Sequence, residues 1–142
     1  MAVKTNWETI AEWKAWHPSE VAIRLRDAGI PWCIAGGWSL DIWRGQETRP
    51  HEDTEIAIPR TCFSTIRSHL SEFRLFAVGN GDVIPLPPET QPPTDKHQVW
   101  VQDEAAHAWR LDIFLEPGDA ETWVFRRNEL IRAPRTKIVA IS

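Results

Sequence analysis

The 142-residue sequence contains no tyrosine, only two cysteines and no surplus of basic residues. Two cysteines cannot form the multi-bridge framework of a small secreted domain, so we expect Cys33 and Cys62 to be reduced. No apolar run approaches the roughly 20 residues of a membrane span, and the first residues lack the apolar stretch of a signal peptide. A net charge of −4 disfavours a general nucleic-acid binder. We therefore expect a cytoplasmic protein that binds neither membranes nor nucleic acids.

The composition is otherwise that of an ordinary globular protein, with 42% hydrophobic and 25% charged residues. The length fits a single domain over residues 1–142 with a real hydrophobic core. The nine tryptophans are unusual, and most must lie in the core or in an interface. They make a homodimer plausible, and the oligomeric state stays open at this stage.

Apolar runs alternate with amphipathic segments along the chain, and this pattern predicts the order of strands and helices. Strands are expected at residues 32–35, 53–58, 73–78, 98–102, 108–116 and 121–125, with a last edge strand at 138–141. Helices are expected at residues 5–15, 17–28, 39–44 and 61–72. Residues 79–96 are rich in proline and glycine and are expected to form a long loop. The order predicts an α/β or α+β fold with a mixed sheet flanked by helices.

A glycine pair, Gly36-Gly37, ends the first apolar run and precedes the short helix that includes Ser39. A glycine turn between a strand and a helix can bring backbone N–H groups close to a phosphate. By itself the pair is a weak signal, because a tight turn needs glycine for steric reasons as well. We therefore judge it together with the acidic residues that follow.

Asp53 and Glu55 lie two residues apart in the strand predicted after that turn. Alternate residues of a strand point to the same face, so the two carboxylates are expected side by side. Paired carboxylate oxygens suit a hard divalent cation such as Mg²⁺; the alternative is a solvated strand face. A third ligand is needed, and Asp112 is the best candidate because a carboxylate among apolar strand residues needs a cation or a donor.

Two further polar groups precede the acidic pair. Arg49 and His51 could reach triphosphate oxygens, and a solvated loop is the equal alternative. Asp41 is expected to cap its helix or to pair with Arg44. In the strand at 108–116, the alternation predicts one apolar and one polar face. The apolar face would carry Trp109, Leu111, Ile113 and Leu115, and the other face Arg110, Asp112, Phe114 and Glu116.

Three segments within residues 36–56 together resemble the signature of the nucleotidyltransferase superfamily. They are Gly36-Gly37-Trp38, then Asp41 and Gly45, then Thr48-Arg49-Pro50-His51-Glu52-Asp53-Thr54-Glu55-Ile56. The nearest resemblance is to the aminoglycoside 2″-nucleotidyltransferase and lincosamide nucleotidyltransferase group, over roughly residues 17–125. It implies that the glycine turn, with Trp38 and Ser39, positions a triphosphate. It also implies that Asp53 and Glu55 bind Mg²⁺ and that Asp112 completes the site and accepts the proton of the attacking hydroxyl.

The activity implied by the resemblance is transfer of a nucleoside monophosphate from a nucleoside triphosphate, with ATP as the expected donor. The acceptor would be a hydroxyl of a small molecule, with aminoglycoside and lincosamide antibiotics as candidates. Two features differ from the family pattern: Glu55 stands where aspartate is common, and the family's helical C-terminal segment is expected to be absent. They leave two alternatives, a non-catalytic nucleotide-binding or interaction module, and a minimal nucleotidyltransferase of a toxin–antitoxin pair that modifies a protein.

Overall fold

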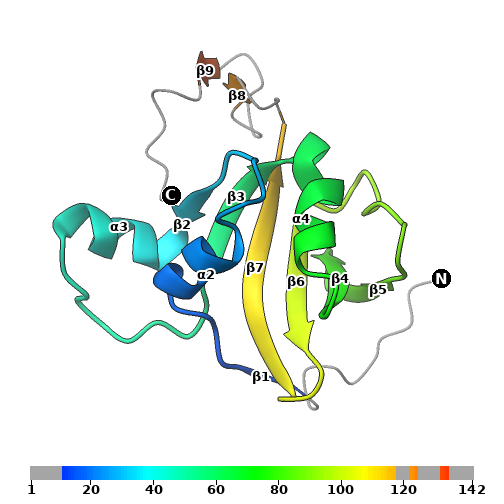
Figure 1. The fold of residues 1–142 in the computed structure, drawn as a ribbon, viewed down its shortest axis with the longest axis horizontal. Helices are drawn as coiled ribbons and strands as arrows, with labels where there is room; N and C mark the ends of the chain where they lie inside the picture. Colours follow the sequence, from blue (N-terminus) through cyan, green and yellow to red (C-terminus); the bar gives the residue numbers. More distant parts are fainter. Residues whose placement is uncertain (1–10, 118–121, 125–131, 135–142) are drawn as a thin grey trace.

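The computed structural model describes residues 11–117 and the backbone of residues 122–124 and 132–134. Within these residues the fold combines a seven-stranded mixed sheet with three α-helices (Figure 1). The prediction of an α+β fold with a mixed sheet is therefore confirmed. None of the described helices has the length and apolar character needed to cross a membrane.

The sheet is built around one long central strand. Its strands run in the order β2 (Cys33–Ala35), β3 (Glu55–Pro59), β7 (Ala108–Glu116), β6 (Gln98–Asp103), β4 (Arg74–Gly79) and β5 (Asp82–Leu86). The short strand β1 (Glu12–Trp13) also pairs with β7. Strands β1 and β3 run parallel to β7, and the other pairings in this sheet are antiparallel. A separate antiparallel pair is formed by β8 (Thr122–Val124) and β9 (Arg132–Pro134).

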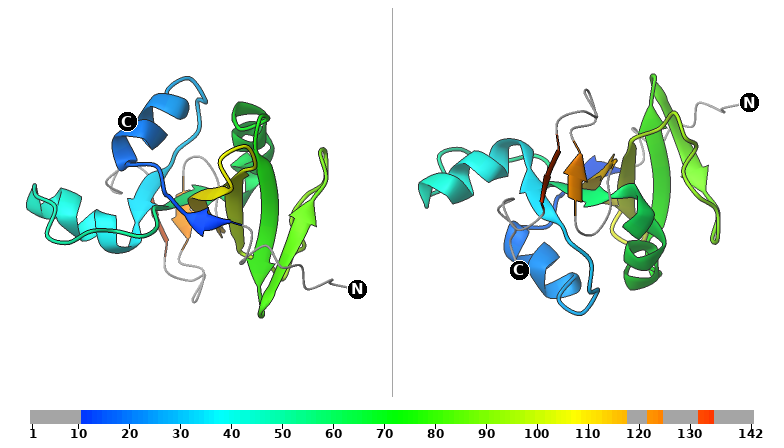
Figure 2. Two further views of the ribbon diagram at one scale, coloured as in Figure 1. Left: turned by 90° about the horizontal axis from the view of Figure 1, so that it is seen from below. Right: turned by 90° about the horizontal axis from the view of Figure 1, so that it is seen from above.

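Helices α2 (Pro18–Arg24) and α4 (Phe63–His69) pack on the same face of the sheet, which we call the helix face (Figure 2). The main core lies beneath them. It is formed by inward-facing residues of both helices and of five strands, among them Val21, Phe63, Ile66, Ile56, Val99, Leu111 and Ile113. Because strand residues alternate, their neighbours Glu55, Trp100 and Asp112 point to the opposite face, which we call the carboxylate face.

The third helix, α3 (Gly36–Arg44), extends from the β2 edge, at the opposite end of the molecule from β5 (Figures 1 and 2). It begins at Gly36 rather than at the predicted Ser39, so both glycines belong to its first turn. Gly36 has a φ of 65°, a conformation that residues with a Cβ atom rarely adopt. The glycine is therefore required where the chain turns from β2 into α3.

The predicted loop at residues 79–96 is wrong in part, because β5 occupies residues 82–86 and pairs with β4. Asn80 and Gly81 connect the two strands with φ angles of 54° and 78°. Two consecutive positive φ angles are typical of tight hairpin turns, and Asn-Gly is their strongest sequence signal. The proline at position 85 is tolerated because β5 is an edge strand.

The predicted helix at 5–15 is wrong where the structure describes it, since Glu12 and Trp13 form β1. Its first residues, 5–10, lie outside the described part, as does the predicted strand at 138–141. The predicted helix at 61–72 begins as the 3₁₀ turn η1 (Arg60–Cys62), and α4 ends at His69.

Trp109 lies on the carboxylate face rather than with its predicted neighbour Leu111. A shift in the β6–β7 register pairs Val101 with Leu111 but Gln102 with Trp109. The extra residue in β7 reverses the alternation, as β-bulges do. Trp109 consequently packs in a small aromatic cluster with Phe76 and Trp100.

Candidate active site

Three carboxylates meet on the carboxylate face, between the start of β3 and the middle of β7. Glu55 and Asp112 are direct partners in the parallel pairing of these strands, and Asp53 lies just before β3. One carboxylate oxygen from each residue lies within 4.8 Å of those of the other two. The structure therefore brings together the three acidic residues that the sequence singles out, although Asp53 precedes the strand rather than belonging to it.

Asp112 is buried, with only 3% of its surface exposed. Its Oδ2 accepts a hydrogen bond of 2.8 Å from Nε2 of Gln98 on the neighbouring strand. Its Oδ1 is also buried and has no hydrogen-bond partner among the described residues. Burial raises the pKa of Asp112 to about 7; the charges of Glu55 and Asp53 act in the same direction, and the Gln98 hydrogen bond opposes them.

Glu55 shows a shift in the same direction. Burial is the main cause of its raised pKa, and the neighbouring Asp53 adds to it. Three acidic groups at such short range repel one another unless a cation or protons compensate their charge. The unpaired Oδ1 of Asp112 and the all-oxygen donor set fit a hard divalent cation such as Mg²⁺.

The glycine turn packs directly against this cluster. A Cβ atom on Gly36 would clash with the carboxylate of Glu55. A Cβ atom on Gly37 would lie 3.0 Å from Nδ1 of His51 and would clash with the guanidinium of Arg49. The absence of side chains at both positions therefore lets the backbone approach an acidic group on one side and basic groups on the other.

The amino end of α3 has no side-chain cap. The N-cap residue Ala35 makes no side-chain capping bond, and the first turn contains no acidic residue. Helix amino termini carry partial positive charge and free N–H groups, which favour phosphate binding. Ser39 does not point freely toward such a ligand, because its hydroxyl donates a 2.6 Å hydrogen bond to the carbonyl of Gly36.

A second buried aspartate, Asp41, ties the loop after α3 to the helix. Its carboxylate accepts hydrogen bonds from the Thr48 backbone N–H (2.9 Å) and from the Thr48 hydroxyl (2.6 Å). Nε2 of His51 lies 2.6 Å from the same group. These hydrogen bonds hold the pKa of Asp41 well below its usual range. Asp41 therefore pairs with Thr48 and His51, and the predicted pairing with Arg44 is wrong.

His51 and Trp38 have structural contacts that their expected role in triphosphate binding did not include. The His51 ring stacks at 4.2 Å on Trp38, which also contacts His17 at 4.9 Å. Because Nε2 of His51 is engaged by Asp41, Nδ1 is the nitrogen that faces the glycine turn. Arg49 donates a 3.3 Å hydrogen bond to the Pro50 carbonyl, and its guanidinium lies beside Gly37.

Sequence reasoning did not identify Gln98 or Trp100 as neighbours of the site. Trp100 is the direct cross-strand partner of Asp112, and Gln98 is the donor to its carboxylate. No motif joins these residues to the acidic pair, so only the register of β6 against β7 reveals them. The partners of Asp41 could have been predicted from the sequence, because Thr48 and His51 lie within ten residues of it.

Residues 19–85 match the family model described as aminoglycoside-2''-adenylyltransferase. The matched segment includes the glycine turn, Asp53 and Glu55, and it ends before Asp112. No curated protein and no solved structure matches the chain. The family match supports, over residues 19–85, the resemblance seen in the sequence.

Proposed function

We propose that the protein is a Mg²⁺-dependent nucleotidyltransferase that transfers a nucleoside monophosphate, with ATP as donor, to a hydroxyl of a small molecule. An aminoglycoside is the first candidate acceptor because of the family match. The observation that carries the proposal is the meeting of Asp53, Glu55 and Asp112 within 4.8 Å beside the glycine turn.

Asp53, Glu55 and Asp112 are the residues that would hold the metal. Mg²⁺, when bound, neutralises charge on the triphosphate and on the three carboxylates. The uncapped amino end of α3 and Arg49 bind the phosphates, and the positive helix end favours the anion. Positioning of this kind supplies much of the rate enhancement in phosphoryl and nucleotidyl transfer.

In the transfer step, the acceptor hydroxyl oxygen forms a bond to the α-phosphorus of the nucleotide. The bond from that phosphorus to the bridging oxygen of the β-phosphate breaks, and pyrophosphate leaves. Asp112 accepts the hydroxyl proton. A cation held by the three carboxylates would favour the ionised form of Asp112, which is the form that can accept a proton.

The test is pyrophosphate release from ATP and Mg²⁺ with a panel of aminoglycosides and lincosamides. We expect release with at least one acceptor, and we expect Asp53→Asn to abolish it without unfolding the protein. Asp27→Asn is the matched control, because Asp27 is exposed and lies outside the site. Full activity in Asp53→Asn would remove this residue from the mechanism.

A non-catalytic nucleotide-binding module is the second candidate, favoured by Glu55 in place of the more common aspartate. The additional methylene changes the reach of the carboxylate by about 1.5 Å. A module of this kind would show a higher melting temperature with Mg-ATP and no pyrophosphate release with any acceptor. If Mg-ATP does not raise the melting temperature and no acceptor causes pyrophosphate release, both candidates are excluded.

A further inference from the structure

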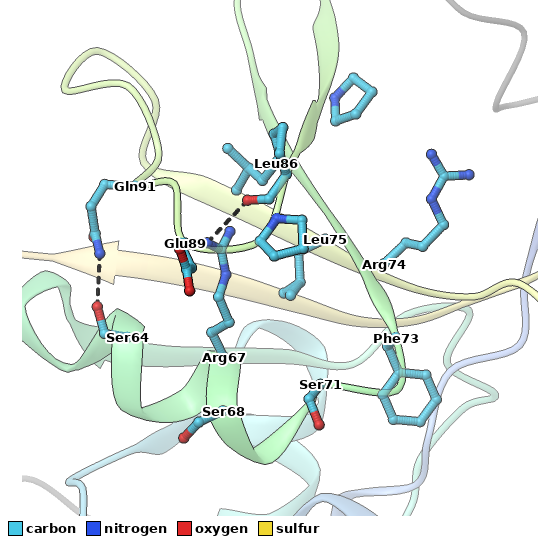
Figure 3. Close-up of a pocket in the computed structure, with 13 residues that line it drawn as sticks. Ser64, Arg67, Ser68, Ser71, Phe73, Arg74, Leu75, Leu86, Glu89 and Gln91 are labelled. Carbon is cyan, nitrogen blue, oxygen red and sulfur yellow. Dashed lines mark hydrogen bonds between the residues drawn. The ribbon is translucent and has the colours of Figure 1, made fainter.

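A separate pocket of about 780 Å³ lies between α4 and the β4–β5 hairpin (Figure 3). Pockets of this size commonly hold small organic ligands. Its apolar surface comes from the sheet and from the turn after β5, mainly Leu75, Leu86, Pro87 and Phe73. The pocket lies on the helix face, whereas Glu55 and Asp112 point to the carboxylate face. It is therefore distinct from the candidate active site.

Arg67 of α4 also lines this pocket, and only part of its guanidinium is engaged. Its Nη1 donates to the backbone carbonyl of Pro87 at 3.3 Å and to that of Thr90. Its Nε and Nη2 are shielded from water and have no hydrogen-bond partner within the described chain. Leaving buried donors unpaired costs free energy, so a ligand that satisfied them would be bound favourably.

The two unpaired nitrogens form one edge of the planar guanidinium. This is the edge through which arginine binds a carboxylate with two parallel hydrogen bonds. The group packs over the Phe63 ring, with Cζ 4.8 Å from the ring centroid. An arginine with a free carboxylate-binding edge beside an apolar cavity is a suitable arrangement for an amphipathic anion.

The other polar groups of the pocket limit the charge of the ligand. Arg74 and Glu89 also line the cavity and carry opposite charges, so the three charged residues of the lining sum to one positive charge, which a singly charged anion neutralises. Ser64 is already engaged by Gln91 through a 2.7 Å hydrogen bond. A single carboxylate matches the one free guanidinium edge.

We propose that this pocket binds a small organic monocarboxylate with an apolar, ring-sized body. The carboxylate pairs with Nε and Nη2 of Arg67 after a side-chain rotation that turns this edge into the cavity. The apolar body packs against Leu75, Leu86 and Pro87. The proposal is independent of the nucleotidyltransferase assignment, because no residue of the carboxylate cluster takes part.

The test uses two fluorescent probes with the same apolar body, dansylglycine with a carboxylate and dansylamide without one. We expect the protein to bind one dansylglycine per chain and to prefer it over dansylamide by about 10- to 100-fold, the usual range for a charged hydrogen-bonded pair. Arg67→Met, which keeps most of the apolar stem, should abolish the preference and leave dansylamide affinity unchanged.

Arg26→Met is the matched control, because Arg26 is exposed on another segment and should leave both affinities unchanged. Leu86→Trp, which fills the cavity, should weaken both probes. Circular dichroism checks the fold, and Arg67→Lys replaces Arg67→Met if the latter does not fold; its point charge should retain only part of the preference. Equal affinity for the two probes, no saturable binding, or an unchanged preference in the Arg67 variant would overturn the proposal.

Discussion

Two buried aspartates, Asp41 and Asp112, show how differently the same side chain can be used in one small protein. Each has only 3% of its surface exposed. Asp41 has polar partners on both carboxylate oxygens, and their hydrogen bonds hold its pKa well below the usual range. Asp112 accepts a hydrogen bond from Gln98, has one oxygen without a partner among the described residues and lies beside two acidic groups, and burial raises its pKa to about 7.

The comparison separates a carboxylate whose charge is compensated within the protein from one whose charge is not. The neighbours of Asp41 stabilise its charge fully, so it needs nothing from outside the protein. The neighbours of Asp112 leave its charge uncompensated, which is costly in a folded protein unless a ligand completes the site. The same contrast applies to Arg67, whose free edge also lacks a partner in the described part of the chain.

The largest expected effect concerns catalysis. Asp112→Asn should lower the rate of nucleotidyl transfer by about 100- to 10,000-fold, the usual contribution of a general base. Nucleotide affinity should change less than the rate, because the proposed mechanism assigns phosphate binding to the α3 turn and Arg49. Steady-state kinetics of pyrophosphate release give both parameters. A loss confined to nucleotide affinity would contradict a role for Asp112 as the base.

The next effect concerns stability and should have opposite signs at the two positions. At pH 8 and without metal, Asp112→Asn should raise the melting temperature, because it removes an uncompensated buried charge. Asp41→Asn should lower it, because Thr48 and His51 lose their charged acceptor. Thermal unfolding followed by circular dichroism measures both, with Asp27→Asn as the exposed control. Melting-temperature shifts of the same sign in the two variants would contradict the conclusion that the protein compensates the charge of Asp41 but not that of Asp112.

The pH dependence of stability provides an independent check on Asp112. Its folded-state pKa of about 7 lies above the ordinary value of 3.8, so the folded state holds the proton more tightly than the unfolded state. The contribution of Asp112 to the free energy of unfolding is therefore largest below about pH 4. It falls by up to roughly 4 kcal/mol as the pH rises through 7. Asp112→Asn should remove this part of the pH profile. In the unaltered protein, Mg²⁺ should stabilise more at pH 8 than at pH 6, because binding displaces the proton.

The smallest expected effect concerns Gln98, which donates a hydrogen bond to Asp112. Gln98→Leu should weaken Mg²⁺ binding by about 10-fold, since groups that orient a metal ligand commonly contribute 10- to 100-fold in affinity. Mg²⁺-dependent shifts of the melting temperature measure this change. Gln46→Leu is the control, because Gln46 is exposed in the loop after α3. An unchanged response to Mg²⁺ would show that Gln98 does not orient the carboxylate.

The local pattern of the sequence was sufficient for the mixed α+β fold, the glycine turn and the pairing of Asp53 with Glu55. Each of these depends on residues a few positions apart, where side-chain alternation and glycine conformation act directly. The resemblance to the aminoglycoside group also depends on this stretch, which lies within the matched residues 19–85. The Asn80-Gly81 pair also indicates a hairpin, but the proline content of residues 79–96 led to the prediction of a loop there.

Only the tertiary structure decided how distant segments meet. The register of β3 against β7 places Asp112 opposite Glu55, and the bulge in β7 moves Trp109 to the carboxylate face. The partners of Asp112 on β6 and the unpaired edge of Arg67 likewise depend on strand pairing and on packing between elements. Local propensity cannot set these contacts, because a shift of one residue in a strand turns every side chain to the other face.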